Sequence, residues 1–168
     1  MPYTIPDLNK MNQTDFVTAI GDVFEHTPAI AAVAWSQRPF TDVTHLHQTL
    51  VAVMQSLDLA EQLALIQAHP DLGSKAKMAE ASVQEQIGAG LKQLSADEYE
   101  RFLHLNQSYK DKFGFPFIIA VKHHTKASIL DEFDRRLLNS TEAEMQQAIA
   151  EIAEIARFRL LERVASQP

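Results

Sequence analysis

The stretch DLAEQLALIQAHPDLG, residues 58–73, contains the pattern that decides the fold class. Asp58 and Glu61 have the spacing of a capping box, which opens a helix. Pro70 disfavours helical backbone at His69, so the predicted helix ends there. The imidazole would then lie at a helix C-terminus, where the helix dipole favours its protonated form. On this pattern alone, a helix ending is a better interpretation of His69 than a catalytic acid.

Apolar side chains recur at three- and four-residue steps along most of the chain, as they do in amphipathic helices. Further helices are expected over residues 14–26, 44–57, 82–91, 98–113, 126–139 and 141–160. Three more capping boxes support these helices, namely Ser82–Glu85, Ser95–Glu98 and Thr141–Glu144. The buried side of the helix over 98–113 is predicted to carry Phe102, Leu103, Leu105 and Tyr109.

The stretch FGFPFIIAV, residues 113–121, breaks the helical pattern. Gly114 and Pro116 oppose a helix, and the residues that follow have β-type side chains. Because one strand cannot form a sheet, this stretch is expected to be an extended segment packed among helices. The predicted fold is all-α: a single compact domain over residues 1–168, with about seven to eight helices and one extended segment.

Composition and charge exclude several classes of protein. The chain has 168 residues, of which 46% are hydrophobic, and its net charge is −7. Such a charge disfavours general attraction to nucleic acid or to an anionic membrane. The absence of cysteine excludes disulfides and thiolate chemistry and fits a cytoplasmic protein. The N-terminal residues do not resemble a signal peptide, and no apolar run reaches the roughly 18 residues of a membrane span.

The histidines do not have the spacing of metal ligands. His45 and His47 are two residues apart, and His123 and His124 are adjacent, whereas two ligands on one helix face are usually four apart. Solvated surface histidines are the better interpretation, and no metal site is predicted.

Two other places in the chain could carry chemistry. Helix capping already explains Ser82 and Glu85, but the same helix start directs backbone N–H groups outward, where they could bind oxygen atoms. Gly88 and Gly90 form helices poorly and suggest a close approach by a helix or a ligand. In the other place, IARFRL, Arg157 and Arg159 are two residues apart, so at most one is expected to face a site. Spacing alone does not choose between these two arginines.

Four blocks occur in a recognisable order: HPDLG, SVQEQIGAGL, FGFPFIIAV and EIARFRL. Together with LNQSYKDKFGFPF, residues 105–117, they resemble the OHCU decarboxylase family over nearly the whole chain. OHCU is 2-oxo-4-hydroxy-4-carboxy-5-ureidoimidazoline, the last intermediate between urate and allantoin. The resemblance implies an all-α, dimeric enzyme that forms (S)-allantoin without a metal or an organic cofactor.

The resemblance also implies roles for particular residues. His69 would be the catalytic acid–base, and Glu85 would act beside the substrate. Arg159 is the position that aligns with the family's arginine, although Arg157 lies close to it. The implied substrate-binding residues are Pro70, Ser82, Gln86, Phe117, Ile119, Ala120, Val121 and Arg159.

Two other functions remain open at this stage. A non-enzymatic helical module could bind a ureide or a peptide in the same pocket, with His69 serving only as a helix ending. A metal-dependent hydrolase is the weaker alternative. The resemblance favours a small-molecule decarboxylase, expected to be a cytoplasmic homodimer with no nucleic-acid or membrane partner.

Overall fold

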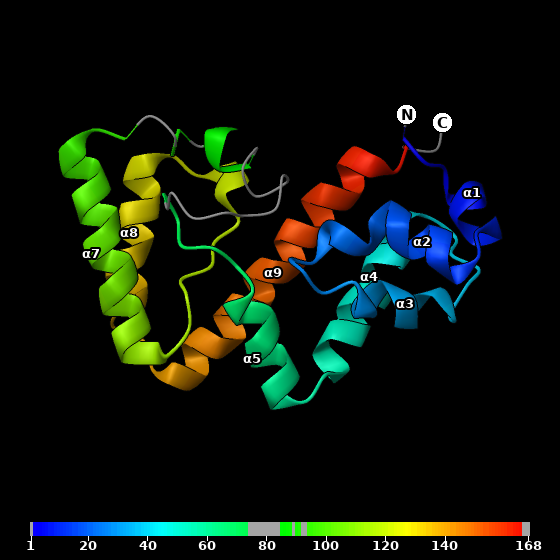
Figure 1. The fold of residues 1–168 in the computed structure, drawn as a ribbon, viewed down its shortest axis with the longest axis horizontal. Helices are drawn as coiled ribbons and strands as arrows, with labels where there is room; N and C mark the ends of the chain where they lie inside the picture. The colour runs from blue at the N-terminus through cyan, green and yellow to red at the C-terminus, as the bar shows by residue number, and fades with distance from the viewer. Residues whose placement is uncertain (1, 74–84, 89, 92–93, 166–168) are drawn as a thin grey trace. The chain divides into compact units, whose positions relative to one another are not determined.

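The computed structural model describes residues 2–73, 85–88, 90–91 and 94–165, and within these ranges it is built from helices (Figure 1). The all-α prediction is therefore confirmed. The helices are α1 (Ile5–Lys10), α2 (Gln13–Ile20), α3 (Ala29–Trp35), α4 (Val43–Ser56), α5 (Leu59–Gln67), α7 (Ala96–Phe113), α8 (Lys126–Arg136) and α9 (Thr141–Arg163). Short 3-10 helices cover Gly21–Val23 and Val121–His123, and residues 85–88 form one further helical turn.

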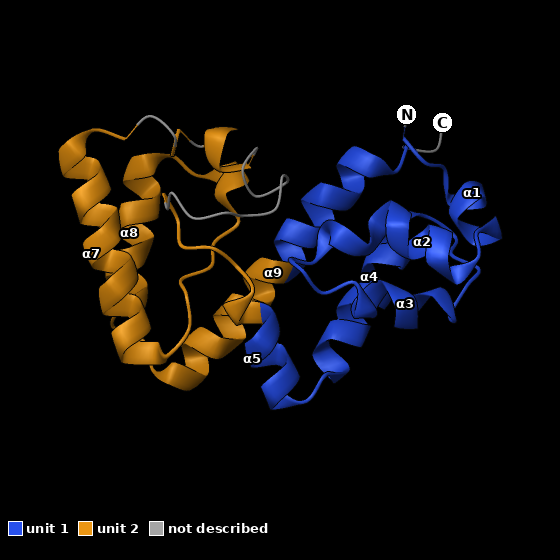
Figure 2. Ribbon diagram, viewed as in Figure 1, with its two compact units in different colours: residues 1–65, 153–168 blue, residues 66–152 orange. Residues whose placement is uncertain are grey.

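The chain forms two compact units (Figure 2). Unit 1 comprises residues 1–65 and 153–168, and unit 2 comprises residues 66–152. The chain passes from one unit to the other within α5 and again within α9. Sequence analysis treats the chain as one domain and gives no sign of this division.

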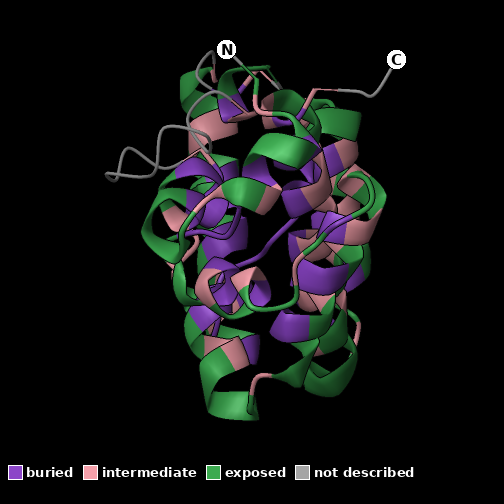
Figure 3. Cartoon of the chain, turned by 90° about the vertical axis from the view of Figure 1, so that its right-hand side faces the viewer, coloured by how far each residue is buried: buried purple, intermediate pink, exposed green. Residues whose placement is uncertain are grey.

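Unit 1 is a helical cluster in which α3 packs against both α2 and α4. Apolar side chains such as Phe16, Ile30 and Leu50 are almost completely buried there. Buried residues lie on the inward sides of the helices and exposed residues on their outer sides (Figure 3). This arrangement is what the three- and four-residue spacing of apolar side chains predicts.

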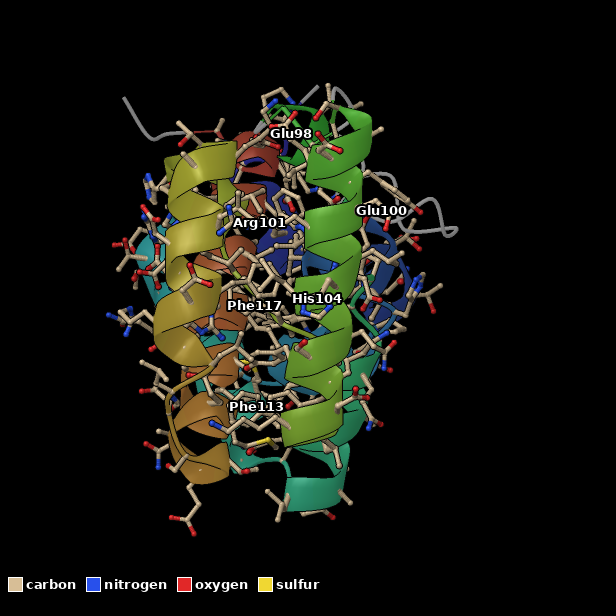
Figure 4. All side chains as sticks on the ribbon, turned by 90° about the vertical axis from the view of Figure 1, so that its left-hand side faces the viewer. Glu98, Glu100, Arg101, His104, Phe113 and Phe117 are labelled. Atoms are coloured by element: carbon tan, nitrogen blue, oxygen red, sulfur yellow. The ribbon has the colours of Figure 1, made fainter. Side chains whose placement is uncertain are left out.

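Unit 2 contains the segment that breaks the helical pattern. Helix α7 ends at Gly114, whose positive φ of 81° suits a residue without a Cβ. Residues 115–120 then follow without helical structure, and all of them are buried. Phe117 stacks on Phe133 of α8 with ring centroids 3.8 Å apart and meets Tyr109 of α7 edge-on. Figure 4 shows Phe117 between these two helices, so the predicted extended segment packed among helices is confirmed.

The predicted capping boxes fare differently. Ser95 and Glu98 form the reciprocal bonds of a capping box, and Asp58 accepts a hydrogen bond from the N–H of Glu61. The box at Thr141 is wrong, because the hydroxyl of Ser140 accepts from the N–H of Ala143 and caps α9 instead. The side chain of Glu144 is completely buried and forms an ion pair with Arg136 instead.

Three further expectations also need correction. The helix expected over residues 14–26 ends at Ile20, and after the 3-10 helix Gly21–Val23 the backbone is extended at Phe24. Leu103, expected on the buried side of its helix, is 51% exposed. The short helices α1 and α3 were not predicted at all.

Among the described helices, none is long and apolar enough to cross a membrane alone. Helices α4 and α5 meet the length and composition criteria only as a pair, and this pair is bent by 114°.

Candidate active site

His69 lies just beyond the end of α5, as the sequence predicts. The helix ends at Gln67, and the N–H of His69 donates to the carbonyl of Ile66 at 3.2 Å, which closes the last turn. His69 and Pro70 are both half-buried. The imidazole is therefore carried by a fixed backbone at a helix terminus, and it keeps some access to solvent.

The three residues after Pro70 are anchored to other parts of unit 2. Lys110 of α7 donates to the carboxylate of Asp71 at 2.7 Å. The buried side chain of Asn106, also on α7, donates to the carbonyl of Leu72 at 2.8 Å. The N–H of Gly73 donates to Oε1 of Gln86 at 3.1 Å. These contacts hold the loop that carries His69 against α7 and against the helical turn 85–88.

Glu85 and Gln86 lie in that helical turn. Gln86 is 6% exposed, whereas Glu85 is half-buried. The bond from Gly73 to Gln86 links the turn directly to the loop that carries His69. Ser82, the third residue predicted in this region, lies outside the described residues. Three of the predicted site residues, His69, Glu85 and Gln86, thus belong to one connected part of unit 2.

The two glycines of this region do not mark a close approach of the protein backbone. A Cβ placed on Gly88 would meet no described atom within 4 Å. Gly90 has a φ of 81°, which accounts for a glycine there through its backbone conformation. Among the described residues no helix packs closely on Gly88, and close approach by a ligand, the other predicted cause, stays a prediction.

The predicted pocket-lining residues Phe117, Ile119, Ala120 and Val121 are all buried in unit 2. Two backbone groups of this segment are bound by charged side chains. The carbonyl of Ile118 accepts from Nη1 of Arg136 at 2.6 Å, and the N–H of Ala120 donates to Oε2 of Glu151 at 3.0 Å. The Ala120 amide therefore already has a carboxylate partner and would have to exchange it to bind a substrate oxygen.

Arg159 and Arg157 lie in unit 1, in different environments. Arg159 is 2% exposed, and its Nη2 donates to the buried carboxylate of Glu25 at 3.2 Å. Its Nη1 lies 3.4 Å from the carbonyl oxygens of Asp22 and Val23. Arg157, in contrast, forms a partly exposed pair with Glu154 at 3.1 Å. Only Arg159 thus has the burial and the fixed carboxylate partner that a preorganised binding group requires.

Unit 2 also contains a buried group of charged side chains, which the sequence analysis does not predict. Glu144 accepts from Nε of Arg136 at 2.8 Å and from the hydroxyl of Tyr109 at 2.6 Å, and both of these side chains are also buried. Burial, together with the hydrogen bond to Glu144, raises the pKa of Tyr109 well above its usual value. The phenol therefore stays protonated as a donor.

The part of the chain that the structure describes contains no group of three or more histidine, aspartate or glutamate side chains arranged to hold a metal ion. His45 and His47 do not form such a group: His45 accepts from the N–H of Thr41, and Nε2 of His47 lies 2.8 Å from the carbonyl of Ala153.

Two carboxylates that bind predicted site residues are not predicted from the sequence. Glu25 binds Arg159, and Glu151 binds the amide of Ala120. Both glutamates are on helical or turn segments where a solvated charge is the usual expectation. Near Glu25, the only local signal in the sequence is Pro28, which favours a turn but does not indicate a buried carboxylate. No pattern of spacing indicates Glu151.

Comparison with known proteins groups this chain with enzymes that remove a carboxyl group. The family model for OHCU decarboxylase matches residues 9–161, and the chain belongs to this family. A 2-oxo-4-hydroxy-4-carboxy-5-ureidoimidazoline decarboxylase of Halalkalicoccus jeotgali is 42% identical over 159 residues, which are 95% of this chain and 90% of that protein.

Two other relatives are longer than this chain. The uric acid degradation bifunctional protein PucL of Bacillus subtilis is 43% identical over 165 residues, and the chain spans 33% of its length. Among solved structures, that of an (S)-allantoin synthase matches with a TM-score of 0.78 and 27% identity, over 96% of this chain and 54% of the other.

Proposed function

We propose that this chain decarboxylates OHCU to (S)-allantoin, the last step of urate degradation to allantoin. The observation that carries the proposal is the connection of His69 to the helical turn of Glu85 and Gln86 through the bond from Gly73 to Gln86. It joins the two blocks that the family resemblance assigns to catalysis. The relatives that are decarboxylases by name match nearly the whole chain.

The chemistry needs no external electron acceptor. The name of the substrate puts the hydroxyl and the carboxyl on ring carbon 4 and the ureido group on carbon 5. When the bond from carbon 4 to the carboxylate breaks, CO₂ leaves and the electron pair forms a double bond between carbons 4 and 5. The electrons of the former double bond between carbon 5 and the ring nitrogen move onto that nitrogen, which leaves an enol. Water supplies a proton to the ring nitrogen. The hydroxyl proton then leaves oxygen while carbon 5 gains a proton, and the product is allantoin.

His69 is the proposed carrier of the proton between oxygen and carbon. Histidine suits this role because an imidazole can both accept and return a proton near neutral pH. His69 lies at the end of α5, directly before Pro70, and this fixed position would determine the face of the substrate ring that receives the proton. Protonation from one face would give (S)-allantoin rather than a racemate.

Glu85 is proposed to orient the substrate's N–H groups and to oppose the departing carboxylate. Gln86 would hold the His69 loop through Gly73 and contribute its amide to the site. Pro70 and Ser82 are proposed to line the same pocket.

The backbone of residues 117–121 is proposed to read the ureide ring. Successive residues of extended backbone direct their N–H and C=O groups to opposite sides. The backbone groups of Ile118 and Ala120 bind Arg136 and Glu151, so in an extended segment the groups of Ile119 between them would face the opposite side. We infer that Ile119, rather than Ala120, donates to the substrate oxygen, with Phe117 and Val121 flanking it.

Arg159 is proposed to anchor the carboxylate or the ureido end of the substrate, with Glu25 holding the guanidinium. From the family resemblance we also propose that the protein acts as a cytoplasmic homodimer without a metal or an organic cofactor. The non-enzymatic binding module is not favoured, because the family and its named relatives are enzymes.

The test generates OHCU in the cuvette from urate with the preceding oxidase and hydrolase. Circular dichroism then follows (S)-allantoin after the protein is added, with and without a chelator. A fast rise that the chelator leaves unchanged supports the proposal. A trace identical to the slow spontaneous decay contradicts it, and light scattering on a sizing column tests the homodimer independently.

A further inference from the structure

Arg136 is the largest completely buried side chain among the described residues, and the proposed chemistry does not use it. It lies at the end of α8, where an arginine normally reaches solvent. Its side chain and that of Glu144 both have zero exposure. Burying two charges is costly unless their geometry and additional hydrogen bonds compensate for the lost water. Burial of this pair therefore costs desolvation free energy, and a function served by the pair would account for this cost.

The contacts of Arg136 converge on the segment 117–121. Nε donates to Glu144 at 2.8 Å, and Nη1 donates to the carbonyl of Ile118 at 2.6 Å. The guanidinium also lies over the ring of Phe117, with Cζ 4.3 Å from the ring centroid. One side chain thus holds two successive residues of the segment, one through its ring and one through its backbone.

Glu144 fixes the orientation of the guanidinium. Its carboxylate accepts from the hydroxyl of Tyr109 on α7 at 2.6 Å and from Nδ2 of Asn139 at 2.8 Å, in addition to Arg136. The three donors come from α7, from α8 and from the turn that follows α8. A carboxylate bound in this way cannot rotate without breaking several charge-assisted hydrogen bonds.

We propose that Arg136, oriented by Glu144, is a positioning residue that sets the register of the segment 117–121 and so aims the backbone groups of Ile119 at the substrate. The effect on catalysis rests on the proposed decarboxylase function, whereas the anchoring of the segment does not. Nη2 of Arg136 has no hydrogen-bond partner in the described structure, so the hydrogen bonds of the guanidinium are those made by Nε and Nη1. Its orientation consequently depends on Glu144 and Ile118.

The test replaces the network by apolar side chains, with Arg136→Met, Glu144→Leu and Tyr109→Phe in one variant. Such replacement of a buried ion pair is often neutral for stability, so the variant is designed to fold. Two quantities are measured, the amide hydrogen exchange of residues 117–121 and the kinetic constants for OHCU. Arg135→Met is the matched control, because Arg135 is the neighbouring arginine of α8 and forms an exposed pair with Glu132.

The expected result is exchange at residues 117–121 faster by about tenfold or more, while exchange in the middle of α7 stays within about threefold. The value of kcat is expected to fall by about 10- to 100-fold with a smaller change in KM, because the donors to the reacting oxygen are misplaced. A folded variant with wild-type exchange and wild-type kcat would overturn the proposal.

If the apolar variant does not fold, Arg136→Lys replaces it. Lysine keeps the charge opposite Glu144 but lacks the fork that reaches Ile118 at the same time. Faster exchange at 117–121 and a lower kcat are again expected, and wild-type values of both contradict the proposal. If the wild-type protein does not decarboxylate OHCU, the proposed function fails, and exchange alone then decides whether Arg136 anchors the segment.

Discussion

The described residues include two buried arginine–glutamate pairs, one in each unit, and their contacts differ. In unit 2, Arg136 binds Glu144 and the carbonyl of Ile118 at 2.8 and 2.6 Å. In unit 1, Arg159 lies 3.2 Å from Glu25 and 3.4 Å from two carbonyl oxygens. Short bonds to a backbone carbonyl suit a residue that holds structure. For Arg159, the family resemblance instead implies a role in substrate binding, which stays a prediction.

The strongest test of this difference is the removal of each carboxylate. Glu144→Ala leaves the charge of Arg136 buried without its partner and is expected to lower the free energy of unfolding by about 3–5 kcal/mol. Urea denaturation at neutral pH measures this change. A loss below about 1 kcal/mol would show that the pair is not structural.

The same substitution in unit 1 is expected to cost less stability and more substrate binding. Glu25→Ala should lower the free energy of unfolding by about 1–3 kcal/mol, because Arg159 loses a charge-assisted hydrogen bond but keeps the carbonyl oxygens of Asp22 and Val23 beside it. It should also raise KM for OHCU by about tenfold or more, because Arg159 loses its orientation. Steady-state kinetics measure KM, and an unchanged KM in a folded variant contradicts the role of Arg159.

A third test uses pH to examine the Tyr109 hydroxyl that binds Glu144. Burial raises the pKa of Tyr109 in the folded protein, so the unfolded chain loses this proton first as pH rises. The stabilisation is therefore complete below the unfolded tyrosine's pKa of about 10 and declines above it, by up to about 1.4 kcal/mol per pH unit. Tyr109→Phe should remove this part of the alkaline decline. Identical stability profiles of variant and wild type above pH 10 would contradict the account.

The smallest effect is expected at an exposed pair of the same chemistry. Arg135 and Glu132 face solvent on α8, and exposed pairs contribute about 0–1 kcal/mol. Arg135→Met should therefore change the free energy of unfolding by less than about 0.5 kcal/mol and leave KM unchanged. A large loss of unfolding free energy in Arg135→Met would mean that burial does not explain which arginines of this protein contribute to stability.

The same contrast shows how far the sequence alone could go. The apolar spacing and the capping residues Asp58 and Ser95 are local signals, so they predicted most helices and the all-α class. The proline and glycine of FGFPF predicted the buried segment for the same reason. The short helices α1 and α3 have only six and seven residues, too few for a periodic pattern to stand out.

The candidate site was predicted only in part, because its supporting contacts join residues far apart in the chain. His69 at a helix end follows from Pro70, a neighbour in sequence. The bonds of Arg159 to Glu25 and of Ala120 to Glu151 span 134 and 31 residues, and no local pattern encodes them. Glu144 was assigned to a capping box because its spacing fits one, yet Ser140 caps the helix and Glu144 is buried with Arg136.

The central claim is that His69 carries the proton in a decarboxylation of OHCU. The most direct measurement is the initial rate of (S)-allantoin formation, followed by circular dichroism, for wild type, His69→Ala and His104→Ala. His104 is exposed on α7 and serves as the matched control (Figure 4). The account predicts a fall in rate of at least about 100-fold for His69→Ala and none for His104→Ala. Rapid formation of (S)-allantoin by folded His69→Ala protein would contradict it.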